Sequence, residues 1–271
     1  MALSPRPALS PRATRSPRTA GAGARPAVPH TPDSGFAVAE DGTRNPDNDV
    51  LRAHDVTVTR GPATILRRMS VGIRADETFA VTGPTGAGKS ALLAVLSGVI
   101  APDAGQVWFN SRPLHTLGDR ARGELRRTHF GMLDGRARLM PELTVLENVA
   151  LPLLLEPGTR GTAFAAARHW MGRLDVLDHA DQRPHQLPPA LLRRAAVARA
   201  LVVRPDVVFA DEPGLGLHGA ELDHLMRILV SASRSHGIAL VLATDDPQVA
   251  RHADRTLELR DGRPVPVRTD A

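Results

Sequence analysis

The sequence contains no cysteine and no tyrosine, and only one of its 34 Lys and Arg residues is a lysine. The absence of cysteine excludes disulfides and thiolate metal sites, which suits a reducing cytoplasm. Without Cys and Tyr, and with one Lys, little titrates between about pH 8 and 12. The pI of about 11.0 therefore follows from a formal charge of only +5, and it does not indicate a nucleic-acid partner.

Aromatic residues and long apolar runs are also scarce. Aromatics make up 3% of the 271 residues and the basic residues are scattered, so we expect no nucleic-acid binding. No apolar run approaches the roughly 18 residues of a membrane helix. The N-terminus has arginines with no apolar stretch behind them, unlike a secretory signal. A role at a membrane would therefore require docking onto a protein that spans it.

The first 49 residues differ in composition from the rest of the chain. A Ser-Pro-Arg triplet recurs every six residues, beginning at Ser4, Ser10 and Ser16. Because proline favours extended backbone and few large apolar residues are available to bury, residues 1–49 are predicted to be a disordered tail. A basic arm that contacts anionic lipid or a partner is one alternative, and a start codon assigned too far upstream is another.

Strand and helix patterns alternate from residue 50 to residue 263, followed by a short tail over 264–271. Residues 50–59 and 64–74 predict a hairpin, and 78–83 and 105–110 predict short strands. Helices are predicted over 90–100 (closed by Pro102), 116–129, 144–156, 162–177, 190–203 and 220–237. Residues 206–213 and 238–246 predict further strands, and 256–265 a closing hairpin. We predict an α/β fold with a mostly parallel core, an antiparallel β layer and a helical subdomain over about 136–203.

The segment GPTGAGKS, residues 83–90, fits a phosphate-binding loop between a strand and a helix. Glycines let several N–H groups point at one phosphate, and the helix N-terminus adds positive charge. Lys89 is predicted to reach the β- and γ-phosphates of ATP, and Ser90 to bind Mg²⁺. A glycine-rich turn without a ligand is the alternative. The expected nucleotide contacts are Gly83, Pro84, Thr85, Gly86, Ala87, Gly88, Lys89, Ser90 and Ala91.

A second strand supplies the acids that such a loop requires. Val207 to Ala210 are apolar and place Asp211 at the carboxyl end of a strand, where ligands bind in open α/β sheets. Asp211 is predicted to hold Mg²⁺ through water. Glu212 is predicted to be the catalytic residue that orients or deprotonates the attacking water, with Lys89 as the catalytic cation.

Together these motifs resemble those of the ATP-binding cassette (ABC) family of transporter ATPases. The segments LTVLENVALPLLL, AVARAL, ADEP and LELRDGR are most similar to the lipoprotein-export, macrolide-export and cell-division branch. The resemblance covers about residues 51–263. It implies a two-lobed P-loop NTPase domain whose head-to-tail dimer holds ATP between one subunit's phosphate loop and the other's LSGGQ signature. It also implies a transmembrane permease partner and a peripheral position on the inner face of the cell membrane.

The signature itself is replaced in this sequence. Where the family has a serine and glycines, the chain has Leu187, Pro188, Pro189, Ala190 and Leu191. Proline has no N–H to donate, and alanine adds a Cβ where close approach to phosphate is needed. Two prolines that simply start a helix fit this segment better. We therefore expect this signature not to clamp phosphate.

Other family positions also depart from the pattern. Gly135 falls where a Mg²⁺-contacting glutamine is expected, with Asp134 beside it as a partial substitute or, more simply, a solvated turn acid. Asp245 replaces the histidine that contacts the γ-phosphate, where an anion repels phosphate unless protonated or bridged by Mg²⁺. His218 replaces the aspartate of the loop after the catalytic glutamate. Arg60 replaces the aromatic residue that stacks on adenine, and a guanidinium can also stack there.

These departures leave several functions open. The preferred one is the ATP-binding subunit of a membrane transport complex, as a homodimer or as a heterodimer with a second cassette, with impaired or partner-dependent ATP hydrolysis. The alternative is an ATP-sensing scaffold or regulatory protein outside transport. A DNA-repair or translation ABC protein is disfavoured, because the chain has one cassette, no long coiled-coil insert and no concentrated basic face.

Overall fold

A computed structural model of the chain describes residues 49–265. The predicted N-terminal tail lies outside the described residues except for Asp49, which begins the first strand. The predicted C-terminal tail lies outside them except for Pro264 and Val265, and Pro264 belongs to the last strand. Within the described range, no helix combines the length and the apolar character that crossing a bilayer requires.

The N-terminal part of the domain forms a four-stranded antiparallel sheet in the order β2-β1-β4-β5. The predicted hairpin is present, since β1 pairs antiparallel with β2 from Asp49↔Arg74 to Arg60↔Ala63. Strand β4 joins the other edge of β1. The strands are β1 (Asp49–Arg60), β2 (Ala63–Arg74), β4 (Ala104–Phe109) and β5 (Arg112–Pro113).

The second sheet has six strands in the order β10-β9-β3-β8-β7-β6. Its pairs are parallel except β10–β9, which is the predicted closing hairpin. The predicted phosphate loop and the two acids Asp211 and Glu212 therefore follow strands of one parallel sheet. The strands are β3 (Thr78–Thr82), β6 (Phe130–Asp134), β7 (Val207–Asp211), β8 (Ala239–Thr244), β9 (Arg255–Arg260) and β10 (Arg263–Pro264).

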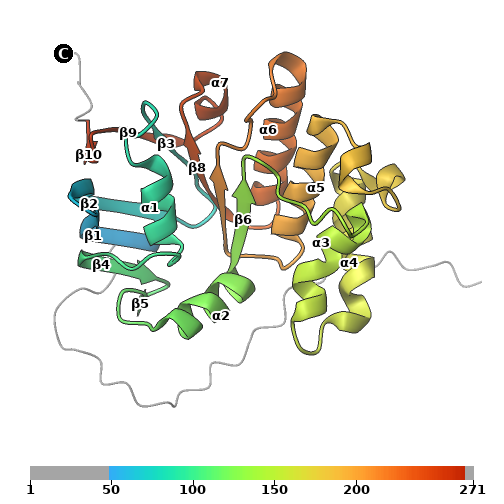
Figure 1. The fold of residues 1–271 in the computed structure, drawn as a ribbon, viewed down its shortest axis with the longest axis horizontal. Coiled ribbons are helices and arrows are strands. Elements are labelled where there is room, and N and C mark those ends of the chain that lie inside the picture. The colour runs from blue at the N-terminus through green and yellow to red at the C-terminus, as the bar shows by residue number, and fades with distance from the viewer. Residues whose placement is uncertain (1–48, 266–271) are drawn as a thin grey trace, which may run out of the picture. The chain divides into compact units, whose positions relative to one another are not determined.

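The helices cover both faces of this parallel sheet, with α1 beside the four-stranded sheet and α5 and α6 on the other side (Figure 1). Such double coverage explains why the central strands are continuous apolar runs. The helices are α1 (Lys89–Leu96), α2 (Asp119–His129), α3 (Val145–Leu155), α4 (Arg160–Arg173), η1 (Leu177–His179), η2 (Pro184–Gln186), α5 (Pro189–Leu201), α6 (Gly219–Arg234) and α7 (Pro247–Ala250).

Strand β8 shows how the sheet divides two hydrophobic cores. Ala239, Val241 and Ala243 join the core that contains α1 and the four-stranded sheet. The intervening Leu240 and Leu242 join the core built with α3 to α6. Since side chains alternate along a strand, one fully buried segment serves both cores, and its carboxyl end is held rigidly.

One helix is shorter than predicted, and one strand was not predicted. Helix α1 ends at Leu96 and does not reach Ile100, because Gly98 turns the backbone into the left-handed region (φ 66°). The region from about 116 to 180, expected to be dominated by helices, contains strand β6. Strand β6 follows α2 without a turn, so no turn residues in the sequence mark the change from helix to strand.

The segment after β6 is anchored by the first turn of α3. Thr144 caps this helix, with its side chain accepting from the Glu147 N–H while the Glu147 side chain accepts from the Thr144 N–H. Asn148 is fully buried and bonds the backbone of Met140, Leu143 and Thr144. The motif LTVLENV thus fixes the loop that leaves β6.

Candidate functional site

The loop between β3 and α1 has the curled backbone that its glycines permit. Gly83, Gly86 and Gly88 have φ values of 137°, 85° and 106°. A Cβ on Gly83 would lie 2.2 Å from the Leu259 carbonyl oxygen, so no other residue fits there. Gly88 is the N-cap of α1, whose first turn contains no acidic residue. The loop therefore presents backbone N–H groups and the positive end of a helix without a competing carboxylate in that turn.

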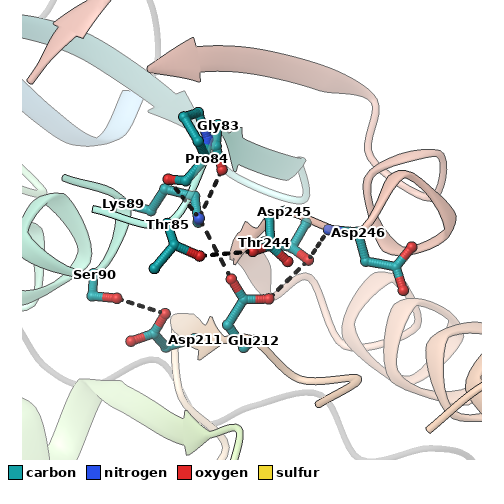
Figure 2. A network of polar contacts seen from close by, with 10 residues as sticks. All are labelled: Gly83, Pro84, Thr85, Lys89, Ser90, Asp211, Glu212, Thr244, Asp245 and Asp246. Atoms are coloured by element: carbon teal, nitrogen blue, oxygen red, sulfur yellow. Dashed lines mark hydrogen bonds and ion pairs between the residues drawn. The ribbon is translucent and has the colours of Figure 1, made fainter. Parts of the chain in front are cut away.

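Lys89 is the first residue of α1 and is only 6% exposed. Its Nζ donates to the carbonyl oxygens of Gly83 (2.8 Å) and Pro84 (3.3 Å), and lies 3.6 Å from Glu212 Oε1. Figure 2 shows the ammonium at the centre of these contacts. A compact cation on a long stem fits this enclosed position, and a planar guanidinium does not.

Ser90, in the first turn of α1, contacts Asp211, the last residue of β7. Ser90 Oγ donates to Asp211 Oδ1 at 3.0 Å, across the carboxyl ends of β3 and β7. Burial raises the pKa of Asp211 and the Asp134 charge adds to this effect, against the Ser90 hydrogen bond and Lys89. A hydroxyl and a carboxylate fit Mg²⁺, which takes oxygen ligands and keeps several waters. Within residues 49–265 no three His, Asp or Glu side chains form a metal-binding group, so such an ion would also need water or phosphate oxygens.

Glu212 follows Asp211 with a left-handed backbone (φ 49°) that directs its side chain toward the phosphate loop. Its N–H donates to the Ala243 carbonyl, and its Oε2 accepts from Thr244 Oγ1 at 3.1 Å. Burial is the main cause that raises the pKa of Glu212, and the charges of Asp245 and Asp211 act in the same direction. Thr244 and Lys89 oppose them. A carboxylate with a raised pKa and one oxygen held in place is suited to accept a proton from water.

Gly135 contributes backbone to this region, since it lies against the peptide groups of the two acids. A Cβ on Gly135 would lie 2.5 Å from the Glu212 carbonyl oxygen and 3.0 Å from that of Asp211. Asp134 accepts from the Arg136 N–H (2.8 Å) and pairs with Arg138 Nε (2.7 Å). Asp134 is therefore engaged in its own turn, and Gly135 takes up the space beside Glu212.

Asp245 follows β8 and reaches the phosphate loop. Thr85 Oγ1 donates to Asp245 Oδ2 at 3.3 Å. The next residue, Asp246, caps α7 by accepting from the Gln248 N–H. Sequence reasoning found Asp245 only as a departure from the family and missed the contacts of Thr85 and Thr244. Their only signal was their position, at the loop and at the carboxyl end of a buried strand.

The remaining predicted nucleotide contacts lie around the loop. Ala87 is buried, and its carbonyl accepts from the Gly262 N–H at 3.0 Å, which ties the loop to the turn between β9 and β10. Ala91 lies in the first turn of α1, half-buried. Arg60 is exposed at the end of β1, opposite Ala63. In the described part of the chain, no hydrogen bond or ion pair links Arg60 to residues 83–90.

The segment predicted to replace the signature, residues 187–191, starts helix α5. Pro188 is the N-cap of α5 and makes no side-chain capping bond, and Pro189 is the first residue of the helix. This agrees with the expectation that the two prolines start a helix. Among residues 49–265, segment 187–191 makes no hydrogen bond or ion pair with the loop 83–90.

Comparisons with known proteins agree with this architecture. The family model described as ABC transporter matches residues 66–214. The chain is 35% identical over 222 residues to the ABC transporter ATP-binding protein YbbA of Escherichia coli K12, which covers 80% of this chain and 97% of that protein. YbbA of Shigella flexneri matches with the same identity and coverage.

Solved structures are similar as well. A dimer of the ATP-binding cassette MJ0796, in a post-hydrolysis state with ADP and phosphate, matches with 28% identity and a TM-score of 0.72. The match covers 80% of this chain and 99% of that one. The protein cbiO1 of Clostridium perfringens, part of an ABC transporter complex, matches with 22% identity, a TM-score of 0.75 and coverage of 81% and 88%. This second likeness concerns the fold alone.

Proposed function

The chain belongs to the ABC transporter family as an ATP-binding subunit, and from this premise we propose that it binds Mg-ATP at residues 83–90 and hydrolyses it weakly or only with a partner cassette. The observation that carries the proposal is the contrast between an assembled phosphate loop and a signature segment that begins with two prolines. Lys89, Ser90, Asp211 and Glu212 lie within one network. Pro188 and Pro189 cannot supply N–H donors to a partner's nucleotide.

Each residue of the network has a defined task in the proposed reaction. Lys89 exchanges its carbonyl partners for the β- and γ-phosphate oxygens, and the N–H groups of the loop surround the phosphates. Ser90 and Asp211 would hold Mg²⁺, which neutralises charge on the phosphates when bound.

Glu212 performs the proton transfer. It accepts a proton from water while the water oxygen bonds to the γ-phosphorus and the bond to the β–γ bridging oxygen breaks, leaving ADP and phosphate. Thr244 fixes one of its oxygens and leaves Oε1 on the side of Lys89.

The proposed assembly includes a transmembrane permease and a second cassette, with the chain on the inner face of the membrane. A homodimer would place the same proline pair opposite both nucleotide sites. A heterodimer would give the site with Lys89 and Glu212 an intact signature from its partner. The segments LTVLENVALPLLL and LELRDGR support an assignment to the lipoprotein-export, macrolide-export and cell-division branch.

Measurement of ATPase activity tests the proposal. We expect the purified chain to hydrolyse ATP at a rate close to that of its Lys89→Ala variant, and to gain activity when a cassette with an intact signature is added. Turnover by the chain alone at rates of ordinary ABC ATPases would contradict the impaired signature. A chain that also fails to bind ATP would contradict the proposal as a whole.

A second candidate function is an ATP-sensing scaffold outside transport. It is favoured by Gly135 and Asp245, which occupy positions that in the family contact Mg²⁺ and the γ-phosphate and respond to the permease. Affinity purification from membrane extracts separates the two functions. Recovery of a multi-span permease supports the transport subunit, and recovery of soluble partners alone supports the scaffold.

A further inference from the structure

Three carboxylates lie at the proposed nucleotide site, which contains a single ammonium. Glu212 lies 3.6 Å from Lys89 Nζ, Asp211 accepts from Ser90, and Asp245 accepts from Thr85 (Figure 2). The acids come from the ends of two neighbouring strands, β7 and β8. The single positive charge of Lys89 therefore does not balance the three negative charges of these acids.

Two of the three carboxylates have tasks in the proposed reaction. Asp211 accepts a hydrogen bond from Ser90 and belongs to the proposed Mg²⁺ site. Glu212 is held by Thr244 and belongs to the proton transfer. Asp245 has neither task, and its partner is the hydroxyl of a residue within the phosphate loop. While Thr85 donates to Asp245, that hydroxyl is not available to a phosphate oxygen.

The position of Asp245 matters most for the last phosphate of a nucleotide. A phosphate-loop lysine lies between the β- and γ-phosphates, so the γ-phosphate occupies the side toward the catalytic acid. Glu212 is on that side of Lys89, and Asp245 directly follows Thr244, whose hydroxyl donates to Glu212. The Asp245 charge also contributes to raising the pKa of Glu212. A γ-phosphate bound there would face Asp245, whereas a diphosphate ends before it.

We propose that Asp245 sets the nucleotide preference of this site, disfavouring a third phosphate so that ADP is held at least as tightly as ATP. The inference rests on the proposed function, since it requires that residues 83–90 bind a nucleotide. Its physical basis is the repulsion of like charges at close range together with the occupied Thr85 hydroxyl. Removal of the charge is expected to raise ATP affinity about tenfold and to change ADP affinity by less than about threefold.

The neighbouring residue provides a matched control. Asp246 carries the same charge, but its carboxylate accepts from the Gln248 N–H and points away from Lys89 (Figure 2). Asparagine caps a helix about as well as aspartate, so Asp246→Asn retains the α7 cap. A general effect of net charge would appear in both Asp245→Asn and Asp246→Asn, and a local effect only in the first.

The experiment is a titration of the full chain with ATP and with ADP, each with Mg²⁺ and with EDTA, by isothermal calorimetry. The expected result is an ATP-to-ADP affinity ratio about tenfold higher in Asp245→Asn than in the wild type, and unchanged in Asp246→Asn. An unchanged ratio in Asp245→Asn would overturn the inference. Weaker ATP binding by Asp245→Asn in Mg²⁺ alone would also overturn it, because Asp245 would then act as a cation ligand.

The Lys89→Ala variant separates this inference from the proposed function. If Lys89→Ala binds both nucleotides as the wild type does, or if the wild type binds neither, the nucleotide site itself is refuted. If Lys89→Ala loses affinity for both nucleotides while Asp245→Asn keeps the wild-type ratio, only the role of Asp245 is refuted.

Discussion

Helix α1 begins after a loop with three glycines of positive φ, whereas α5 begins at a pair of prolines. By the proposed correspondence with the ABC family, the start of α1 lies at the nucleotide site of its own subunit and the start of α5 at that of the partner. At α1 the N–H groups of the first turn are available to a phosphate, although the Ala87 N–H donates to the Pro84 carbonyl, and Lys89 adds a buried cation. At α5 the first positions have no N–H to offer.

The two N-termini also differ in what stabilises them. The glycine loop loses much conformational entropy on folding. Its shape is held by the hydrogen bond from the Gly262 N–H to the Ala87 carbonyl and by the bonds of Lys89 to the Gly83 and Pro84 carbonyls. The prolines of α5 are already restricted to helix-compatible φ, and seven residues of the helix are buried, among them Ala195, Val197 and Leu201. Helix α5 is therefore complete without a ligand.

The largest effect is expected from Lys89→Ala, which removes the buried cation at the start of α1. The β- and γ-phosphates lose their fixed counter-ion, and we expect ATP affinity to fall about 100-fold or more, measured by calorimetry. Lys89→Arg is the matched variant, and its guanidinium has no room between the Gly83 and Pro84 carbonyls. We expect it to recover little of the loss. ATP affinity unaffected by either change would make the loop vestigial.

Gly135→Gln tests whether one substitution can restore the glutamine that the family pattern places at this position, beside Glu212. Because a Cβ at 135 would lie 2.5 Å from the Glu212 carbonyl oxygen, the backbone must shift to admit the side chain. We expect a loss of about 1–3 kcal/mol in unfolding free energy, as for other overpacked sites, and no gain in ATPase activity. Gly135→Ala should show most of the same loss in urea unfolding. Gain of activity with unchanged stability would show that the backbone yields easily.

The double variant Pro188→Ser, Pro189→Gly makes the start of α5 resemble that of α1 chemically. It restores two N–H groups and removes two restricted φ angles, at an expected cost of about 1 kcal/mol in stability. ATP-dependent self-association is expected to increase about tenfold by analytical ultracentrifugation. The same double variant with Lys89→Ala should not respond to ATP. If the double variant stays monomeric with ATP, other parts of the interface prevent the homodimer.

Glu212→Gln gives the smallest expected effect and concerns stability without ligands. The pKa of Glu212 is raised in the folded state, so above the unfolded value of about 4.3 the folded chain binds more protons than the unfolded chain. Its ionisation therefore lowers stability as pH rises. In EDTA at pH 7.5 we expect Glu212→Gln to melt about 1–3 °C above the wild type, with the difference vanishing near pH 4. A lower melting temperature at pH 7.5 would show that the contact with Lys89 outweighs burial.

Sequence reasoning found the parts of this site that depend on local chemistry. A phosphate loop must lie between a strand and a helix, and an acid after an apolar strand must lie at its carboxyl end, so the meeting of Ser90 and Asp211 was predictable. Two other contacts of the site were not predictable. The Thr85–Asp245 bond and the approach of Gly135 to Glu212 depend on the order of strands in the sheet. Strand β6 was missed because it follows α2 directly, with no turn residues between His129 and Phe130.

The isolation of Lys89 has a practical consequence for chemistry on this protein. Apart from the N-terminal amine, its Nζ is the one primary amine in the chain, and it lies 6% exposed at the proposed nucleotide site. An amine-selective reagent therefore has one internal target, and because that target is buried, the rate of its reaction, read by mass spectrometry of intact protein, reports how often the loop opens. The chain carries a built-in probe of local opening, with no label to engineer and no background from surface lysines.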